Sequence, residues 1–221
     1  MPGAAVMLPF GTPAEVAAAI PQVVAHLERG GLLAYPTETV YGLGSSPTVE
    51  ALAALAALKG RSPDKPFLLL VSSRAMAEAW GLVLSPSARA LSAAFWPGPL
   101  TLVLRGGEGR LPDQLRGREG GIAVRHTSHP GVAALVTAFG RPLTSTSANR
   151  PGDAPAPGAD RIADVFRDEI ARGELLLLDG GVLGNVPPST LVDCTGPMPR
   201  LIREGAIPRA ELRRAAGRLA P

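Results

Sequence analysis

The chain has 221 residues, 46% of them hydrophobic and 19% charged, with a formal net charge of +3. This composition is typical of one globular domain with a sizeable core, and it excludes global disorder and a collagen-like chain. The single cysteine, Cys194, excludes a disulfide framework and a cysteine-rich zinc site. Apolar runs such as residues 68–71 are too short to span a membrane, which takes about 20 residues. Residues 1–10 lack a basic segment followed by an apolar one, so we expect no secretory signal and a cytoplasmic protein.

Helix and strand signals alternate along the chain, which predicts an α/β or α+β fold. Thr12 and Pro13 are a suitable cap and first residue for the first helix, and Pro21 within it predicts a kink or a restart. In chain order we expect a helix over 12–29, strands over 32–35 and 67–71 on either side of a helix over 49–58, a helix over 85–95, strands over 100–104 and 122–124, a helix over 128–139, a strand over 143–145, a helix over 160–171, a strand over 175–178, a closing pair of strands at 191–192 and 201–202, and a basic helix over 208–219.

Two long loops rich in glycine, proline and serine stand out, over residues 36–47 and 144–158. Loops of this length in a compact domain usually carry function. Each of them follows a predicted strand, and ligands in α/β sheets bind beyond the carboxyl ends of strands. Residues 106–120 are the best candidate for a mobile surface loop. No repeat or interdomain linker is evident, so we expect a single domain over residues 1–221.

Lysine is rare in this chain: of the 22 basic residues, only Lys59 and Lys65 are lysines. Both lie in one loop, residues 59–66, together with Arg61. Where almost every other cation is arginine, a retained lysine indicates that a compact ammonium group is needed. Three cations within seven residues suit a polyphosphate ligand.

Several common catalytic motifs are absent from the sequence. There is no P-loop, no G-x-S-x-G motif and no H-E-x-x-H motif, and the glycines at 42 and 44 lack the third glycine of a dinucleotide fingerprint. His26, His126 and His129 do not have metal-binding spacing, and we interpret them and Cys194 as structural residues. No metal site held by the protein is therefore predicted.

Seven ordered motifs, over about residues 20–207, carry a resemblance to a known family. They are YPTETVYGLG at 35–44, KGRSPDKPF at 59–67, WPGPLT at 96–101, IAVR at 122–125 with His129 and Pro130, STSAN at 145–149, STLVD at 189–193 and LIREG at 201–205. In these motifs the chain resembles the YrdC-like threonylcarbamoyl-AMP synthases. The family signature, Lys-x-Arg followed by Ser-x-Asn, corresponds here to Lys59, Arg61, Ser147 and Asn149.

The resemblance implies a twisted mixed sheet with flanking helices around a large, basic concave cleft. It also implies a nucleotidyltransferase that makes threonylcarbamoyl-AMP and pyrophosphate from L-threonine, bicarbonate or CO2, and ATP accompanied by Mg2+. Other enzymes of the pathway would then transfer the threonylcarbamoyl group to an adenosine of tRNA, and the protein itself is a possible tRNA binder.

The resemblance assigns a role to each motif residue. Lys59, Arg61 and Arg203 would bind the phosphates of ATP, and Ser147 and Asn149 would lie near ATP and the carbamate. The other predicted residues would bind L-threonine: Arg125 through its carboxylate, and Thr37, Ser145 and Ser189 through hydrogen bonds. Such a site would act by positioning and charge stabilisation, without a covalent nucleophile.

The chain departs from the family pattern in two respects. Many relatives carry His where Leu70 stands, so any contact of that His with threonine would be missing here. The chain is also expected to lack the extra C-terminal domain of the longer family branch, since residues 208–221 form only a short predicted helix.

Two other functions remain open at this stage. A basic cleft could hold double-stranded RNA or tRNA, as an RNA-binding module in RNA or ribosome maturation. The net charge of +3 and the aromatic content of 4% weigh mildly against that function. A carbamoyl-transfer role like that of hydrogenase maturation proteins is disfavoured, because those proteins carry additional zinc-binding and acylphosphatase regions.

Overall fold

A computed structural model describes residues 7–62, 65–184 and 186–220, and Pro63 and Asp64 of the basic loop lie outside this part of the chain. The described residues form an 11-stranded mixed sheet with the order β1-β9-β2-β3-β8-β4-β7-β6-β10-β11, and β5 pairs with β6 off this path. The strands are β1 (Met7–Pro9), β2 (Leu32–Tyr35), β3 (Gly42–Gly44), β4 (Leu68–Val71), β5 (Leu82–Val83), β6 (Leu100–Gly106), β7 (Ile122–His126), β8 (Leu143–Ser147), β9 (Leu175–Asp179), β10 (Thr190–Asp193) and β11 (Arg200–Arg203).

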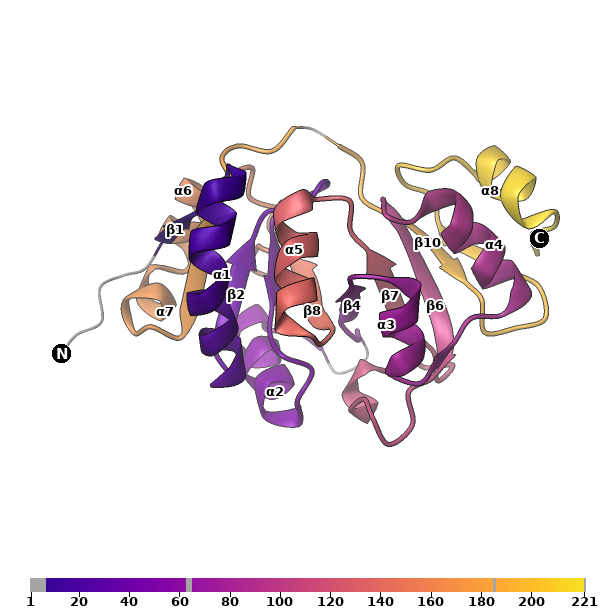
Figure 1. Ribbon diagram of the computed structural model, residues 1–221, viewed down its shortest axis with the longest axis horizontal. Helices are drawn as coiled ribbons and strands as arrows, with labels where there is room; N and C mark the ends of the chain where they lie inside the picture. The colour runs from indigo at the N-terminus through magenta and orange to yellow at the C-terminus, as the bar shows by residue number, and fades with distance from the viewer. Residues whose placement is uncertain (1–6, 63–64, 185, 221) are drawn as a thin grey trace.

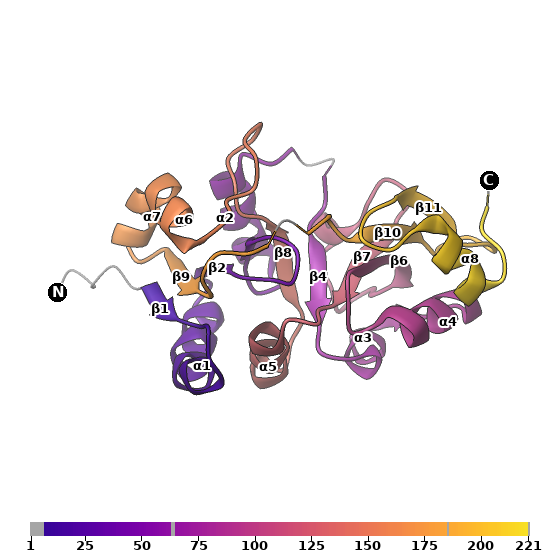
Figure 2. The same ribbon diagram turned by 90° about the horizontal axis from the view of Figure 1, so that it is seen from above.

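Helices cover both faces of the sheet (Figures 1 and 2). They are α1 (Pro13–Glu28), α2 (Val49–Lys59), α3 (Arg74–Ala79), α4 (Pro86–Phe95), α5 (Pro130–Phe139), α6 (Ala159–Val165), α7 (Arg167–Ala171) and α8 (Arg209–Ala216). Seen from above, α1, α5, α3 and α4 lie along one face, whereas α2, α6 and α7 lie on the other (Figure 2). The predicted twisted mixed sheet with flanking helices is confirmed.

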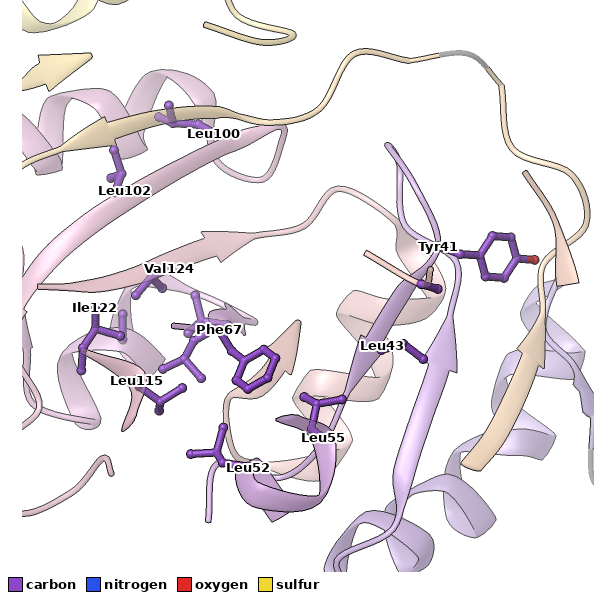
Figure 3. Packing of buried hydrophobic residues seen from close by; sticks show 14 of the residues in the cluster. Tyr41, Leu43, Leu52, Leu55, Phe67, Leu100, Leu102, Leu115, Ile122 and Val124 are labelled. Atoms are coloured by element: carbon purple, nitrogen blue, oxygen red, sulfur yellow. The ribbon is translucent and has the colours of Figure 1, made fainter. Parts of the chain in front are cut away.

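Two clusters of buried apolar side chains hold the helices on the sheet. One packs α1 and α5 against strands of the sheet and includes Val23, Leu135 and Leu143. The larger cluster includes α2, where Leu52 and Leu55 converge on Phe67 (Figure 3). Each fully buried leucine contributes about 1.5–3 kcal/mol, so these clusters hold in place the strands that carry the polar residues.

Local signals explain where the helices begin and end. Thr12 and Glu15 form a capping box at the start of α1, and the Thr48 hydroxyl accepts a hydrogen bond from Ala51 N at the start of α2. Gly60 ends α2 in the left-handed conformation, with φ +58°. Glycine adopts this conformation without strain, so the chain reverses directly between Lys59 and Arg61.

Most predicted elements are confirmed, with three informative differences. Helix α1 runs through Pro21 as one helix, so of the predicted kink or restart the restart is excluded and the kink stays a prediction. The predicted helix over 160–171 is divided into α6 and α7, because Phe166 leaves the helical conformation with φ −118° and ψ 28°. The loop predicted over 36–47 contains β3, which pairs with both β2 and β8.

The remaining differences are short elements that were not predicted. They are β1, α3, β5 and a 3-10 turn over Asp113–Leu115. That turn lies within the predicted surface loop 106–120, whose Leu111 and Leu115 are nevertheless buried. The closing pair of strands is confirmed as the antiparallel pair β10 and β11. None of the helices in the described part of the chain is long and apolar enough to cross a membrane.

Candidate active site

A cavity of about 340 Å3 opens across the middle of the sheet, between segments far apart in the sequence. Its lining includes three arginines, Arg61, Arg125 and Arg203, and no acidic residue among those that the structure describes. The other polar side chains are hydroxyls, from Thr37, Thr39, Thr101, Ser145, Thr146, Ser147 and Ser189. A cavity of this composition favours an anionic ligand that can also accept or donate hydrogen bonds.

Lys59, the last residue of α2, reaches across to the loop that follows β8. Its Nζ donates to Ser147 O at 2.7 Å, to Asn149 O at 2.5 Å and to Asn149 Oδ1 at 2.8 Å. Because an ammonium group has three donors, all of them are used by these acceptors. Lys59 is only 7% exposed and does not line the cavity, but it fixes the backbone of Ser147, which does.

The Lys59 ammonium is electrostatically unusual. Burial, followed by the charge of Arg61, lowers its pKa to about 8, although Asp153 opposes the shift. All three of its hydrogen-bond acceptors are neutral oxygens, so its charge is not cancelled by any of them. This ammonium therefore adds positive potential to the adjacent cavity.

Arg61 lines the cavity from the start of the basic loop. Its guanidinium donates to Thr146 Oγ1 at 3.0 Å, to Pro66 O at 2.7 Å and to Lys65 O, and it lies over the Phe67 ring, 4.8 Å from the centroid. Burial lowers the pKa of Arg61. As with Lys59, every acceptor is neutral, so the guanidinium is held in place with its charge intact.

Arg125, near the end of β7, has a different environment. Its Nη2 forms an ion pair with Glu38 Oε1 at 2.7 Å, and Nη1 and Nη2 each lie 3.4 Å from Thr39 Oγ1. Arg125 is 4% exposed, and its Nε is buried without a hydrogen-bond partner. Burial alone would raise the pKa of the Glu38 carboxyl, but Arg125 and the Thr127 hydroxyl bring it below its usual value.

The smaller polar side chains are held by their own networks. The Thr37 hydroxyl donates to Val40 O at 2.7 Å and accepts from the Thr39 and Val40 amides, both at 3.2 Å. The Ser189 hydroxyl pairs with Thr101 Oγ1 at 2.9 Å. The exposed Arg203 donates to Ser189 O at 2.8 Å. These bonds pre-organise the hydroxyls before a ligand binds.

The structure brings the predicted residues together in two ways. Those that line the cavity are Thr37, Arg61, Arg125, Ser145, Ser147, Ser189 and Arg203. Lys59 and Asn149 do not line it and instead contact each other, and Asn149 Nδ2 donates to Arg150 O and Asp153 O at 2.9 and 2.7 Å.

Sequence reasoning did not single out Thr39 and Thr101, which line the cavity, or Glu38, which binds Arg125. All three lie inside quoted motifs, at 35–44 and 96–101. Position within a motif was therefore the available signal for them.

Leu70, where the family resemblance leads us to expect His, is buried in the cluster beneath α1 and α5. It pairs in register with Arg125 on β7, but it is not part of the cavity lining. On the same strand, Leu68 does line the cavity. The chain therefore presents an apolar side chain from β4, with no imidazole from this strand.

The donor set of the cavity does not suit a protein-held metal. Among the described residues there is no group of three or more His, Cys, Asp or Glu side chains that could hold a metal ion. Hydroxyls and guanidinium groups line the cavity, whereas Mg2+ in proteins is bound mainly by carboxylates and phosphates. The lining therefore suits a Mg2+ ion only if a phosphate ligand carries it.

A larger cavity, of about 710 Å3, lies against α2 and α7 and contains none of the predicted residues. Two of its arginines are neutralised: Arg150 pairs with Glu169 at 2.8 Å, and Arg172 with Glu174 at 2.9 Å. Its charge is therefore largely compensated, unlike that of the smaller cavity.

Comparisons with known proteins identify relatives of this chain. A family model named Sua5_yciO_yrdC and described as "Telomere recombination" matches residues 25–205. Proteins named threonylcarbamoyl-AMP synthase from Chromohalobacter salexigens and Thiobacillus denitrificans are 43% and 39% identical to this chain. The two matches cover 81% and 78% of this chain, and 94% and 89% of those proteins.

Solved structures show the same fold. The crystal structure of Pyrococcus abyssi Sua5 complexed with L-threonine has a TM-score of 0.87 and 32% identity over 98% of this chain, which spans 63% of that longer protein. Escherichia coli YciO has a TM-score of 0.77 and 26% identity, covering 90% of this chain and 94% of that one. The chain belongs to the Sua5/YciO/YrdC family.

Proposed function

We propose that the chain is a threonylcarbamoyl-AMP synthase, which converts L-threonine, CO2 or bicarbonate, and ATP into threonylcarbamoyl-AMP and pyrophosphate. One observation supports this proposal above all: a single cavity combines three arginines with a row of hydroxyls and has no acidic lining among the described residues. Such a lining suits an amino-acid carboxylate, a carbamate and a triphosphate together. The names of the curated relatives support it independently.

The reaction needs positioning more than proton chemistry. The amine of threonine adds to CO2 and loses a proton, which gives a carbamate. A carbamate oxygen then attacks the α-phosphorus of ATP, a new P–O bond forms, and the bond to pyrophosphate breaks. No side chain has to act as a nucleophile, so aligned reactants and stabilised negative charge account for the catalysis.

Each part of the cavity has a role in this proposal. Arg125 binds the threonine carboxylate, and Thr37, Ser145 and Ser189 provide hydrogen bonds to the rest of that substrate. Arg61 and Arg203 bind the phosphates of ATP, which carry Mg2+. Ser147 lies beside the reacting groups, and Lys59 with Asn149 supports it. The enzyme acts as an adenylyl transferase in the cytoplasm, and further enzymes of the pathway transfer the product's threonylcarbamoyl group to tRNA.

The proposal is tested by measuring pyrophosphate release from ATP and Mg2+, with and without L-threonine and bicarbonate. Release that requires both co-substrates supports the synthase. Serine and valine in place of threonine then measure specificity. Release that is independent of threonine, from folded protein, contradicts the proposal. Salt-sensitive RNA binding under those conditions would favour an RNA-binding module instead.

A further inference from the structure

The Glu38 carboxylate, which does not line the cavity, is bound at both of its oxygens. Oε1 contacts Arg125 Nη2 at 2.7 Å and accepts from Ser128 N at 3.2 Å. Oε2 accepts from the Thr127 hydroxyl at 2.5 Å. Thr127 is fully buried, and it follows Arg125 by two residues along the chain. The carboxylate is thus fixed by the same segment that carries the arginine it binds.

This arrangement fixes the guanidinium from one side. Arginine has a long side chain whose free rotamers would cost free energy on ligand binding. A charge-assisted hydrogen bond donated to a rigid carboxylate removes that freedom in advance. The hydroxyl of Thr39 at 3.4 Å adds only a weak contact, so Glu38 is the main partner of this side chain.

The guanidinium nevertheless keeps a free donor for a ligand. Nη1 carries two N–H groups and, among the described residues, makes only the 3.4 Å contact with Thr39, and Arg125 lines the cavity. The same geometry therefore uses Nη2 for Glu38 and leaves Nη1 with a donor that has no strong partner in the described part of the chain.

We propose that Glu38 is a positioning residue, which holds the Arg125 guanidinium so that its free donor meets the carboxylate of the amino-acid substrate. The inference rests on the proposed function, because it takes threonine as the ligand of Arg125. Glu38 acts only through Arg125, since it does not line the cavity. Its negative charge also offsets that of Arg125, so Arg125 binds its ligand by aligned donors rather than by net charge.

The test measures L-threonine and ATP affinities by calorimetry for the wild type, Glu38→Ala, Glu38→Gln, Arg125→Ala and the double variant with both alanines. Loss of a hydrogen bond to a charged group is worth about 1.5–3 kcal/mol, so Glu38→Ala should weaken threonine binding by about 10- to 100-fold. ATP affinity should change by less than about twofold, because ATP is bound by other residues. Glu38→Gln should restore threonine binding to within about fivefold, because its amide still accepts from Arg125 and Ser128.

The double variant separates positioning from a general structural effect. If Glu38 acts through Arg125, Glu38→Ala causes no further loss once Arg125 is alanine. An equal loss in both backgrounds, or an equal loss of ATP affinity, overturns the proposal. Should Glu38→Ala fail to fold, Thr127→Val removes the hydroxyl donor to Oε2 at similar volume and should weaken threonine binding by several-fold.

A ligand-independent readout distinguishes this inference from the proposed function. The Nε–H resonance of Arg125, assigned by its absence in Arg125→Lys, should be sharp in the wild type and in Glu38→Gln but broadened in Glu38→Ala. If the three proteins show this pattern but the wild type binds no threonine, the positioning role stands and the proposed function fails. If threonine binds and Glu38→Ala leaves both the resonance and the affinity unchanged, the positioning fails.

Discussion

The cations at the cavity are held in two ways. Arg125 is paired with the Glu38 carboxylate at 2.7 Å, so its charge is compensated and its orientation is fixed. Arg61 and Arg203 in the lining, and Lys59 beside it, have no carboxylate partner within ion-pair distance in the described part of the chain, and they donate to carbonyl and hydroxyl oxygens. Neutral acceptors orient a cation without cancelling its charge.

This difference matches what each kind of cation has to bind under the proposed function. A single carboxylate with a hydroxyl and an amine nearby is recognised by the placement of donors. A triphosphate carries several negative charges, and uncompensated cations attract it through the potential that they create. Four experiments sharpen or break this comparison, and they follow from the largest expected effect to the smallest.

Lys59→Ala should reduce the rate of pyrophosphate release by about 100-fold, because the segment that carries Ser147 loses the ammonium that holds it, and misplacing a reacting group by about 1 Å has an effect of that size. The substitution leaves the carbonyls of Ser147 and Asn149 and the Asn149 side chain without their shared donor. The steady-state rate at saturating substrates measures the effect. Arg167→Ala removes an exposed cation outside the cavity lining and is the control. Wild-type activity in Lys59→Ala would contradict a role for Lys59 in the site.

Arg125→Lys should raise the KM for L-threonine by about 10- to 100-fold, because lysine cannot reproduce the planar fork of a guanidinium. The charge is retained, so an arginine that acts through its charge would tolerate this substitution, whereas one that acts through aligned donors would not. Arg203→Lys changes an arginine without a carboxylate partner in the described part of the chain, so it is the matched comparison and should change the KM for ATP by only a few-fold. Equal tolerance at the two positions would remove the distinction between them.

The pH dependence follows from Lys59, whose pKa is lowered to about 8. Above that pH the neutral amine has two donors for three acceptors, so the rate should fall several-fold between pH 7.5 and pH 9. Stability should change in the opposite direction. The folded state binds fewer protons than the unfolded chain between about pH 8 and the ordinary lysine value of 10.5, so this group makes the free energy of unfolding rise with pH there.

The pH effect is measured as a rate profile and as urea denaturation at each pH. Lys59→Arg keeps its charge through this range, so its profile should lack the fall near pH 8. A fall of the same size in Lys59→Arg would assign the titration to another group.

Ionic strength should produce the smallest effect. Salt screens the uncompensated cations, so raising NaCl from about 0.05 to 0.5 M should increase the KM for ATP by a few-fold. The KM for L-threonine should change less, because the Arg125–Glu38 pair is close to neutral. Comparable salt sensitivity of the two constants would show that Glu38 does not compensate Arg125.

The sequence was informative where the signal is local. Thr12 and Glu15 are three residues apart and mark a helix start. The two lysines of the chain lie in one short loop, which directs attention to Lys59. Gly42 and Gly44 read as loop residues, and β3 forms only because β2 and β8 flank it. A side chain at Gly44 would lie 2.1 Å from Thr144 O, so the glycine allows strands to approach, which a single segment cannot reveal.

The same limit applies to the site. The family resemblance directed attention to seven residues that line the cavity, but it did not predict that Lys59 would be enclosed by Ser147 and Asn149. Nor did it indicate that Glu38 would bind Arg125. Each of these facts depends on a contact between distant segments, and such contacts are set by the order of strands in the sheet.

The hydrogen bonds that join the site segments connect residues that are similarly far apart in the sequence. Lys59 and Asn149 are 90 residues apart, Arg61 and Thr146 are 85 apart, Glu38 and Thr127 are 89 apart, and Thr101 and Ser189 are 88 apart. Closing such long loops costs entropy, so these contacts form slowly and later than the local helices. During refolding from urea, we therefore expect catalytic activity to return later than the helical circular-dichroism signal, and an amino-terminal fragment ending before Ser145 to recover none.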